Sequence, residues 1–149
     1  MMKKLDIATV RPLVLMAIEE DLGPGDVTSE LLFTDGAVAK ANIVSREEII
    51  VAGMDLAAEI LKCYDERLSL KVRINDGGVA HVGSKLGTIE GPLRSMLSAE
   101  RVMLNFLQRL SGIATTTNKY VRAIQGTKAR IYDTRKTMPG WRALEKYAV

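Results

Sequence analysis

The chain has 149 residues, of which 47% are hydrophobic and 26% are charged, an ordinary composition for a globular protein. Its 21 basic and 18 acidic residues leave a net charge of +3, too small to indicate a nucleic-acid surface by itself. The few aromatic residues are not interleaved with Lys or Arg, as a base-stacking platform requires. The sequence therefore predicts one good core, or one small domain and part of another, without a nucleic-acid partner.

Residues that commonly form disulfides and metal sites are scarce. Cys63 is the single cysteine and lies in an apolar helical pattern, so no disulfide can form inside the chain and a cytoplasmic location is expected. His81 is the single histidine and has no cysteine nearby, which argues against a zinc site. No stretch reaches the roughly 18 apolar residues of a membrane span, and the first helical segment is too charged for a signal peptide. We expect no membrane association.

The first helical pattern covers about Thr9 to Leu22, with Thr9 as the expected N-cap and Gly23 as its stop. The turn over residues 20–28 is rich in Gly, Pro and Asp, which predicts irregular, capped backbone. A cation site in this turn is the weaker interpretation, because a calcium loop brings more regularly spaced oxygens.

Alternating residues predict a strand over 37–44, paired with a strand over 49–52 across the polar connection 45–48. Residues 54–64 form an amphipathic pattern and predict a helix that packs on this sheet.

Short strands punctuated by glycines are predicted over 68–74, 79–82 and 85–90. This pattern resembles the barrel-sandwich fold of biotinyl and lipoyl carrier domains, which modify a lysine at a hairpin tip, commonly between two methionines. Lys85 follows Gly83-Ser84 and lacks those flanking residues. The resemblance therefore indicates the architecture of residues 68–91 and leaves the carrier activity as an alternative without its motif.

The longest helical pattern begins at Pro92 and runs from Leu93 to about Leu110. Arg101 interrupts its apolar side, either as an exposed side chain or as a cation delivered to an anion across an interface. Exposed arginine is the common case, so the residue alone favours the surface. Ser111-Gly112 predicts a break, followed by a second helix over 113–125.

A strand over 129–133 is predicted to run into the loop Thr134-Arg135-Lys136-Thr137, which Pro139-Gly140 ends before a helix over 141–148. Polar loops at the carboxyl ends of strands are where α/β proteins place their chemistry. Two adjacent cations flanked by hydroxyls predict an anion site. One βα unit cannot form a parallel sheet, so we expect the beginning of a second domain here.

Three long motifs closely resemble, in order and spacing, the quinolinate phosphoribosyltransferase family, also called nicotinate-nucleotide pyrophosphorylase (carboxylating). Together they extend from the first helix to Val149, and in one-letter code they are E-D-L-G-x-G-D-V-T at 20–28, E-R-x-x-L-N-x-L-x-x-x-S-G-I-A-T at 100–115, and D-T-R-K-T-x-P-G-x-R-x-x-E-K-Y-A-V at 133–149.

The resemblance implies an α+β fold. We expect an N-terminal α/β sandwich domain, barrel-sandwich-like, over residues 1–111. The first βα unit of an incomplete α/β barrel is expected over residues 112–149. The family assembles as a homodimer with active sites between subunits.

The implied reaction joins quinolinate to phosphoribosyl pyrophosphate in NAD biosynthesis, giving nicotinate mononucleotide, pyrophosphate and carbon dioxide, with Mg²⁺. By resemblance, Arg135 and Lys136 bind quinolinate, and Thr134 belongs to the same binding loop. Arg101 is expected to reach the neighbouring subunit's site. No residue is expected to act as a nucleophile.

Two departures from the family pattern stand out. Met138 occupies a loop position where the family usually has threonine. The family's Gly-rich stretch with a His-Arg pair, a later lysine, and the acidic residues for phosphoribosyl pyrophosphate and Mg²⁺ are expected beyond Val149. We therefore expect the N-terminal portion of the enzyme, with half of the site missing.

Two alternatives remain beside this interpretation. One is the related pyrophosphorylase-like protein associated with molybdate transport, which shares the fold and much of the loop. The other is a structural or interaction fragment, in which residues 1–111 fold and dimerise without turnover.

Overall fold

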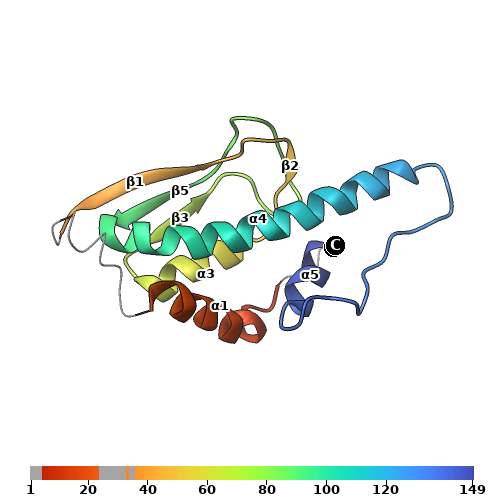
Figure 1. Cartoon of the computed structure of the whole chain (residues 1–149). Coiled ribbons are helices and arrows are strands. Elements are labelled where there is room, and N and C mark those ends of the chain that lie inside the picture. The colour runs from red at the N-terminus through yellow and green to blue at the C-terminus, as the bar shows by residue number, and fades with distance from the viewer. Residues whose placement is uncertain (1–4, 24–32, 34–35) are drawn as a thin grey trace.

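The fold combines helices with small antiparallel sheets, in a computed structural model that describes residues 5–23, 33 and 36–149 (Figure 1). A mixed helix-and-sheet fold was predicted, and this is confirmed. In Figure 1, α4 crosses the view between the strands above it and α1, α3 and α5 below it. In chain order the elements are α1 (Ile7–Leu22), β1 (Val38–Val44), β2 (Ile49–Ile50), α3 (Met54–Tyr64), β3 (Ser69–Val72), β4 (Val79–Ala80), β5 (Lys85–Pro92), α4 (Leu93–Ala123) and α5 (Arg142–Ala148).

The strands form a three-stranded antiparallel sheet in the order β1-β5-β3 and a separate pair, β2-β4. The predicted pairing of strand 37–44 with strand 49–52 was wrong. The backbone of Ser45, just after β1, bonds instead to Ser84 and Gly83 of the β4–β5 turn, at 3.0 and 2.8 Å. Because of these bonds the chain does not form a hairpin after β1, and β5 is the central strand of the sheet. Lys85 begins β5 opposite Val44 and is not at a hairpin tip, which weakens the carrier alternative.

Helix α1 begins at Ile7 with Asp6 as its N-cap, so the prediction of Thr9 was wrong. One carboxylate oxygen of Asp6 accepts a hydrogen bond from the Ala8 backbone nitrogen at 3.1 Å, and the other accepts one from the Thr9 hydroxyl at 2.6 Å. These bonds, the Thr9 hydroxyl first, lower the pKa of Asp6. Thr9 thus supports the cap without being it.

Helix α3 has the predicted bounds, and its amino end is held by a carboxylate from a distant turn. Asp76 accepts hydrogen bonds from the backbone nitrogens of Gly53 and Met54, at 2.7 and 2.9 Å. The Tyr147 hydroxyl of α5 donates to the same carboxylate at 2.5 Å. Burial, followed by this hydrogen bond, raises the pKa of Tyr147. One side chain therefore connects α3, the 75–78 turn and α5.

Helix α4 is continuous over 31 residues, roughly 46 Å, so the predicted break at Ser111-Gly112 was wrong. The buried Ser111 hydroxyl accepts a hydrogen bond from the Ala52 nitrogen and donates one to the Ala52 carbonyl. One turn later, Thr115 accepts a bond from the Ile50 nitrogen at 2.9 Å. The hydroxyls of Ser111 and Thr115 thus satisfy backbone groups of β2 and of the loop that follows it. The division of the chain into domains 1–111 and 112–149 stays a prediction.

Residues 129–133 do not form the predicted strand. Both sheets of the described chain lie within residues 38–92, and neither receives a strand from this segment. A strand requires a neighbour for its backbone hydrogen bonds, and β-propensity cannot supply one. The segment has no regular secondary structure and is exposed instead.

The core lies where α3, the inner sheet face and α4 meet. Burial of these large apolar side chains is the main favourable contribution to folding. The largest fully buried side chains are Met54, Leu56, Ile60, Leu61, Leu68, Met103, Leu110, Leu144, Val14 and Val51.

Gly53 tests how tightly this core fits. Its φ is +105°, and an added Cβ would lie 2.8 Å from Leu110 Cδ1. Gly36 has a similar φ of +98° with nothing within 4 Å, so it is a matched control for backbone strain. We expect Gly36→Ala to cost about 1–3 kcal/mol and Gly53→Ala about 1–3 kcal/mol more, measured by urea denaturation. Equal losses would show that the Leu110 contact is unimportant.

Candidate anion-binding site

The predicted anion-binding loop, residues 134–138, is largely exposed and lies between the irregular segment 129–133 and the turn before α5. The Thr134 hydroxyl accepts a hydrogen bond from the Lys136 backbone nitrogen at 3.1 Å, closing a local turn at Arg135. Thr134, Arg135 and Lys136 are all exposed, so the structure places two adjacent cations and a hydroxyl together at the surface. Their contacts with a substrate stay a prediction.

A second turn ends the loop. The Trp141 backbone nitrogen donates to the Met138 carbonyl at 3.0 Å, with Pro139 and Gly140 at the two corners. Gly140 has a φ of +82°, and the sequence Pro-Gly with a positive φ at the second corner is typical of a type II turn. The turn reverses the chain so that α5 packs back against α4.

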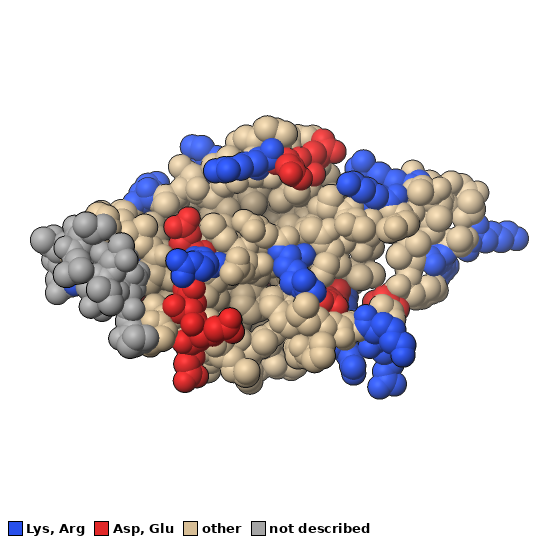
Figure 2. All heavy atoms as spheres, in the orientation of Figure 1, with Lys and Arg blue, Asp and Glu red and all other residues tan. Residues whose placement is uncertain are grey.

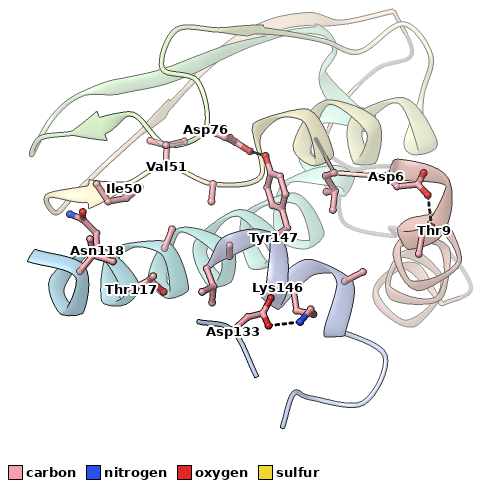
Figure 3. A pocket seen from close by; sticks show the side chains of 18 residues that line it. Asp6, Thr9, Ile50, Val51, Asp76, Thr117, Asn118, Asp133, Lys146 and Tyr147 are labelled. Atoms are coloured by element: carbon pink, nitrogen blue, oxygen red, sulfur yellow. Dashed lines mark hydrogen bonds and ion pairs between the residues drawn. The ribbon is translucent and has the colours of Figure 1, made fainter. Parts of the chain in front are cut away.

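Side chains of α5 hold both ends of the loop. Lys146 pairs with Asp133 just before the loop, as Figure 3 shows. At the other end, Arg142 donates to the Thr137 hydroxyl at 3.4 Å, and the Met138 backbone nitrogen donates to Glu145 at 3.3 Å. The loop geometry is therefore set largely by this short helix.

Helix α5 is in turn fixed to α4 by aromatic and ionic contacts. Trp141 stacks on Phe106 with ring centroids 4.7 Å apart, and the Arg109 guanidinium lies 5.2 Å from the Trp141 ring centroid. Arg109 also pairs with Glu145 at 2.6 Å. The sequence interpretation assigned Arg109 no role and included Glu145 only as a member of the third motif, because their partnership depends on the chain reversal and their spacing carries no signal for it.

Positive charge gathers around the loop. In residues 113–149 the carboxylate side chains are Asp133 and Glu145, and both are in ion pairs. Figure 2 shows blue basic side chains gathered at the end of the molecule where Figure 1 places the end of α4 and the chain leading to α5. The positive electrostatic potential of these side chains favours anionic ligands. The exposed basic residues of this segment are Lys119, Arg122, Lys128, Arg130, Arg135, Lys136, Arg142 and Lys146.

Two cavities lie beside α5. One, of about 670 Å³, separates the loop from α4 and is lined by Thr134 and Thr137 together with Gly112, Thr116 and Tyr120 of α4. Arg135 and Lys136 are not among its lining residues. The other, of about 780 Å³, shares Asp133 and Lys146 with the first, and Figure 3 shows Asp76, Tyr147, Asp133 and Lys146 around it.

Arg101 lies elsewhere in the chain. It is on α4, seven residues or roughly 10 Å along the axis before Gln108, where the lining of the smaller cavity begins. Its guanidinium pairs with Asp21 of α1 at 2.6 Å, and its side chain is 73% exposed. Nearby, burial and the Asp21 carboxylate raise the pKa of Tyr64 to about 12, against an opposing effect of Arg101. Arg101 lines neither of these two cavities.

No metal site is assembled by the part of the chain that the structure describes, since no three His, Cys, Asp or Glu residues cluster there. Asp26, which the weaker interpretation placed in a cation site, lies outside the described residues. Burial, with Glu59 nearby, raises the pKa of the Cys63 thiol, which agrees with a packing role rather than a reactive one. Neither α4 nor any other described helix has the length and apolar character needed to cross a membrane.

The chain is thus a mixed helix-and-sheet protein with an exposed Thr134-Arg135-Lys136 loop. Comparison with family models is specific. The model described as "Quinolinate phosphoribosyl transferase, N-terminal domain" matches residues 26–111, and the corresponding C-terminal domain model matches residues 113–149. The chain belongs to the quinolinate phosphoribosyltransferase family.

Individual relatives agree with this assignment. The chain is 44% identical over 130 residues to a probable nicotinate-nucleotide pyrophosphorylase [carboxylating] of Bacillus subtilis, which covers 87% of the chain and 45% of the relative. It is 40% identical over 155 residues to the nicotinate-nucleotide pyrophosphorylase [carboxylating] of Mycobacterium leprae, covering 100% of the chain and 54% of the relative. The chain thus spans about half the length of the curated relatives it matches.

Solved structures show the same relationship. The nicotinate-nucleotide pyrophosphorylase of Francisella tularensis matches with a TM-score of 0.92 and 37% identity, over 99% of this chain and 52% of that one. NadC from Streptococcus pyogenes matches with a TM-score of 0.94 and 32% identity, over 98% of this chain and 52% of that one.

The exposure of Arg101 gives a stability prediction. The Arg101 guanidinium is 73% exposed, so water screens its pair with the Asp21 carboxylate, which is 16% exposed. We therefore expect Arg101→Ala to change the free energy of unfolding by less than about 1 kcal/mol. Urea denaturation followed by circular dichroism measures this change. A much larger loss would show that Arg101 mainly holds α1 against α4.

Proposed function

We propose that this chain carries the quinolinate-binding loop of a quinolinate phosphoribosyltransferase, which acts with phosphoribosyl pyrophosphate in NAD biosynthesis. The observation that supports the proposal most directly is the exposed Thr134-Arg135-Lys136 loop, held at both ends, in a chain of this family. The names of the relatives from Bacillus subtilis and Mycobacterium leprae agree with it.

The chemistry of the loop suits this substrate. Quinolinate is a dianion with two carboxylates on adjacent ring carbons, so it needs donors in a fixed arrangement. Arg135 offers a planar fork that can bind one carboxylate through two hydrogen bonds, and Lys136 offers a compact charge for the other. The Thr134 hydroxyl already orders the backbone between them at 3.1 Å. These residues would bind and orient quinolinate with its ring nitrogen directed toward the ribosyl donor.

The reaction itself requires positioning and charge stabilisation more than covalent catalysis. The ribosyl carbon passes through an oxocarbenium-like state as pyrophosphate leaves, and the loop would hold the attacking ring nitrogen in line. Once that nitrogen carries the ribose, the cationic ring accepts the electrons released by decarboxylation. The described residues contain no cluster of three His, Cys, Asp or Glu side chains that fits Mg²⁺.

We also propose that the protein is a cytoplasmic homodimer in which Arg101 serves the partner's site. The support is its position: Arg101 lies on a rigid helix, is 73% exposed, and is displaced along α4 from the cavity beside the loop in its own chain. Its ion pair with Asp21 keeps the guanidinium at the surface between α1 and α4.

Titration of the 149-residue chain with quinolinate by calorimetry tests the loop. We expect Arg135→Ala and Lys136→Ala each to weaken binding about tenfold or more, because each removes a charge-assisted contact worth about 1.5–3 kcal/mol. Lys128→Ala is the matched control, since Lys128 is an exposed cation outside the loop, and its affinity should equal that of the wild type.

Nicotinate, which lacks one carboxylate, should bind the wild type more weakly than quinolinate does. The Lys136→Ala substitution should also reduce the affinity for nicotinate by a smaller factor than the affinity for quinolinate. Quinolinate binding that Arg135→Ala leaves unchanged would refute the loop assignment. Absence of binding by the wild type would refute the proposal that this chain carries a working quinolinate site.

A further inference from the structure

We infer that Glu145 is a positioning residue for the Thr134-Arg135-Lys136 loop, and that Arg109 of α4 orients it for this role. The inference rests on the proposed function, because it concerns how the same loop is held for its anion. Glu145 lies on α5, outside the loop and without a charge that could attract quinolinate, so its contribution is geometric.

The two oxygens of the Glu145 carboxylate have separate partners. Oε1 accepts a hydrogen bond from the Arg109 guanidinium at 2.6 Å, and Oε2 accepts one from the Met138 backbone nitrogen at 3.3 Å. The first contact crosses from α5 to α4, and the second reaches back to the last residue of the loop. One carboxylate therefore connects the loop to the longest helix of the described structure.

Burial distinguishes the Glu145 carboxylate from that of the neighbouring Lys146–Asp133 pair. The Glu145 side chain is 16% exposed, whereas that of Asp133 is 37% exposed. The Arg109 guanidinium lies 5.2 Å from the centroid of the Trp141 ring, which itself stacks on Phe106, and this contact restricts the Arg109 side chain. A restricted guanidinium fixes the carboxylate, and the carboxylate fixes the Met138 nitrogen.

The position of Met138 matters because it is the last loop residue before the Pro139-Gly140 turn. With Asp133 held by Lys146 at the opposite end, both ends of a four-residue stretch are fixed, and its cations lie between them. Binding to a preorganised loop does not have to supply the cost of ordering it. Loss of the Glu145 contact should therefore weaken anion binding even though no ligand contact is removed.

The test combines quinolinate titration with hydrogen exchange at the Met138 amide, measured by NMR on the 149-residue chain. We expect Glu145→Ala to weaken quinolinate binding about two- to tenfold and to speed exchange of the Met138 amide. Glu145→Gln keeps an oxygen for the Met138 nitrogen but loses the charge for Arg109, so it should fall between wild type and Glu145→Ala. It also provides a milder variant if Glu145→Ala folds poorly.

Glu59→Ala is the matched control. Glu59 of α3 pairs with Arg11 of α1 at 2.9 Å, and its side chain is 22% exposed. The substitution therefore removes a comparable ion pair between two helices, away from the loop. Its quinolinate affinity and Met138 exchange should be those of the wild type.

Wild-type binding that survives Glu145→Ala unchanged would overturn the positioning role and leave the proposed function intact. An equal loss on Glu59→Ala would also overturn it, because the effect would then follow general stability. Absence of binding by the wild type itself would refute the proposed function and this inference together.

Discussion

The continuity of α4 is the constraint on which the rest of the structure depends. The helix contributes Met103 and Leu110 to the core, and its Ser111 hydroxyl satisfies both backbone groups of Ala52. Because the helix does not break there, Thr116 and Tyr120, which line the cavity beside the loop, keep a fixed relation to Phe106 and Arg109, which contact Trp141 and α5. A kink at Gly112 would move this wall of the cavity relative to the core. The hydrogen bonds of Ser111 to Ala52 therefore help to set the surface that the Thr134-Arg135-Lys136 loop faces.

The loop itself contains little that could hold it in one shape. Its own internal contact is the bond between the Thr134 hydroxyl and the Lys136 nitrogen, and its other contacts come from Trp141 and from α5. Exposed loops bearing like charges repel themselves and lose much conformational entropy on ordering. Here the short helix α5 orders the loop, and α5 is itself fixed to α4 through the Trp141–Phe106 stack and the Arg109–Glu145 ion pair. The loop cations are therefore not needed to hold the loop in place.

Local patterns predicted the parts of the fold that depend on local physics. The helix at residues 54–64 was found with the predicted bounds because amphipathic spacing and Gly53 determine it. The predicted strand pairing was wrong because the actual pairing depends on hydrogen bonds between Ser45 and a turn some forty positions further along the chain. The strand predicted at 129–133 required a neighbour that the described chain does not provide. The loop cations were identifiable as adjacent charges, whereas Arg109 and Glu145 became partners only through the reversal at Pro139-Gly140.

The stack of Trp141 on Phe106 has a practical consequence. Trp141 is the single tryptophan of the chain, and it lies at the junction of the loop, α4 and α5. Its indole emission therefore originates from one known place, beside the Arg109 guanidinium and one residue after the turn that closes the loop. The protein carries an intrinsic optical reporter of the docking between loop and helix, which no labelling chemistry has to introduce.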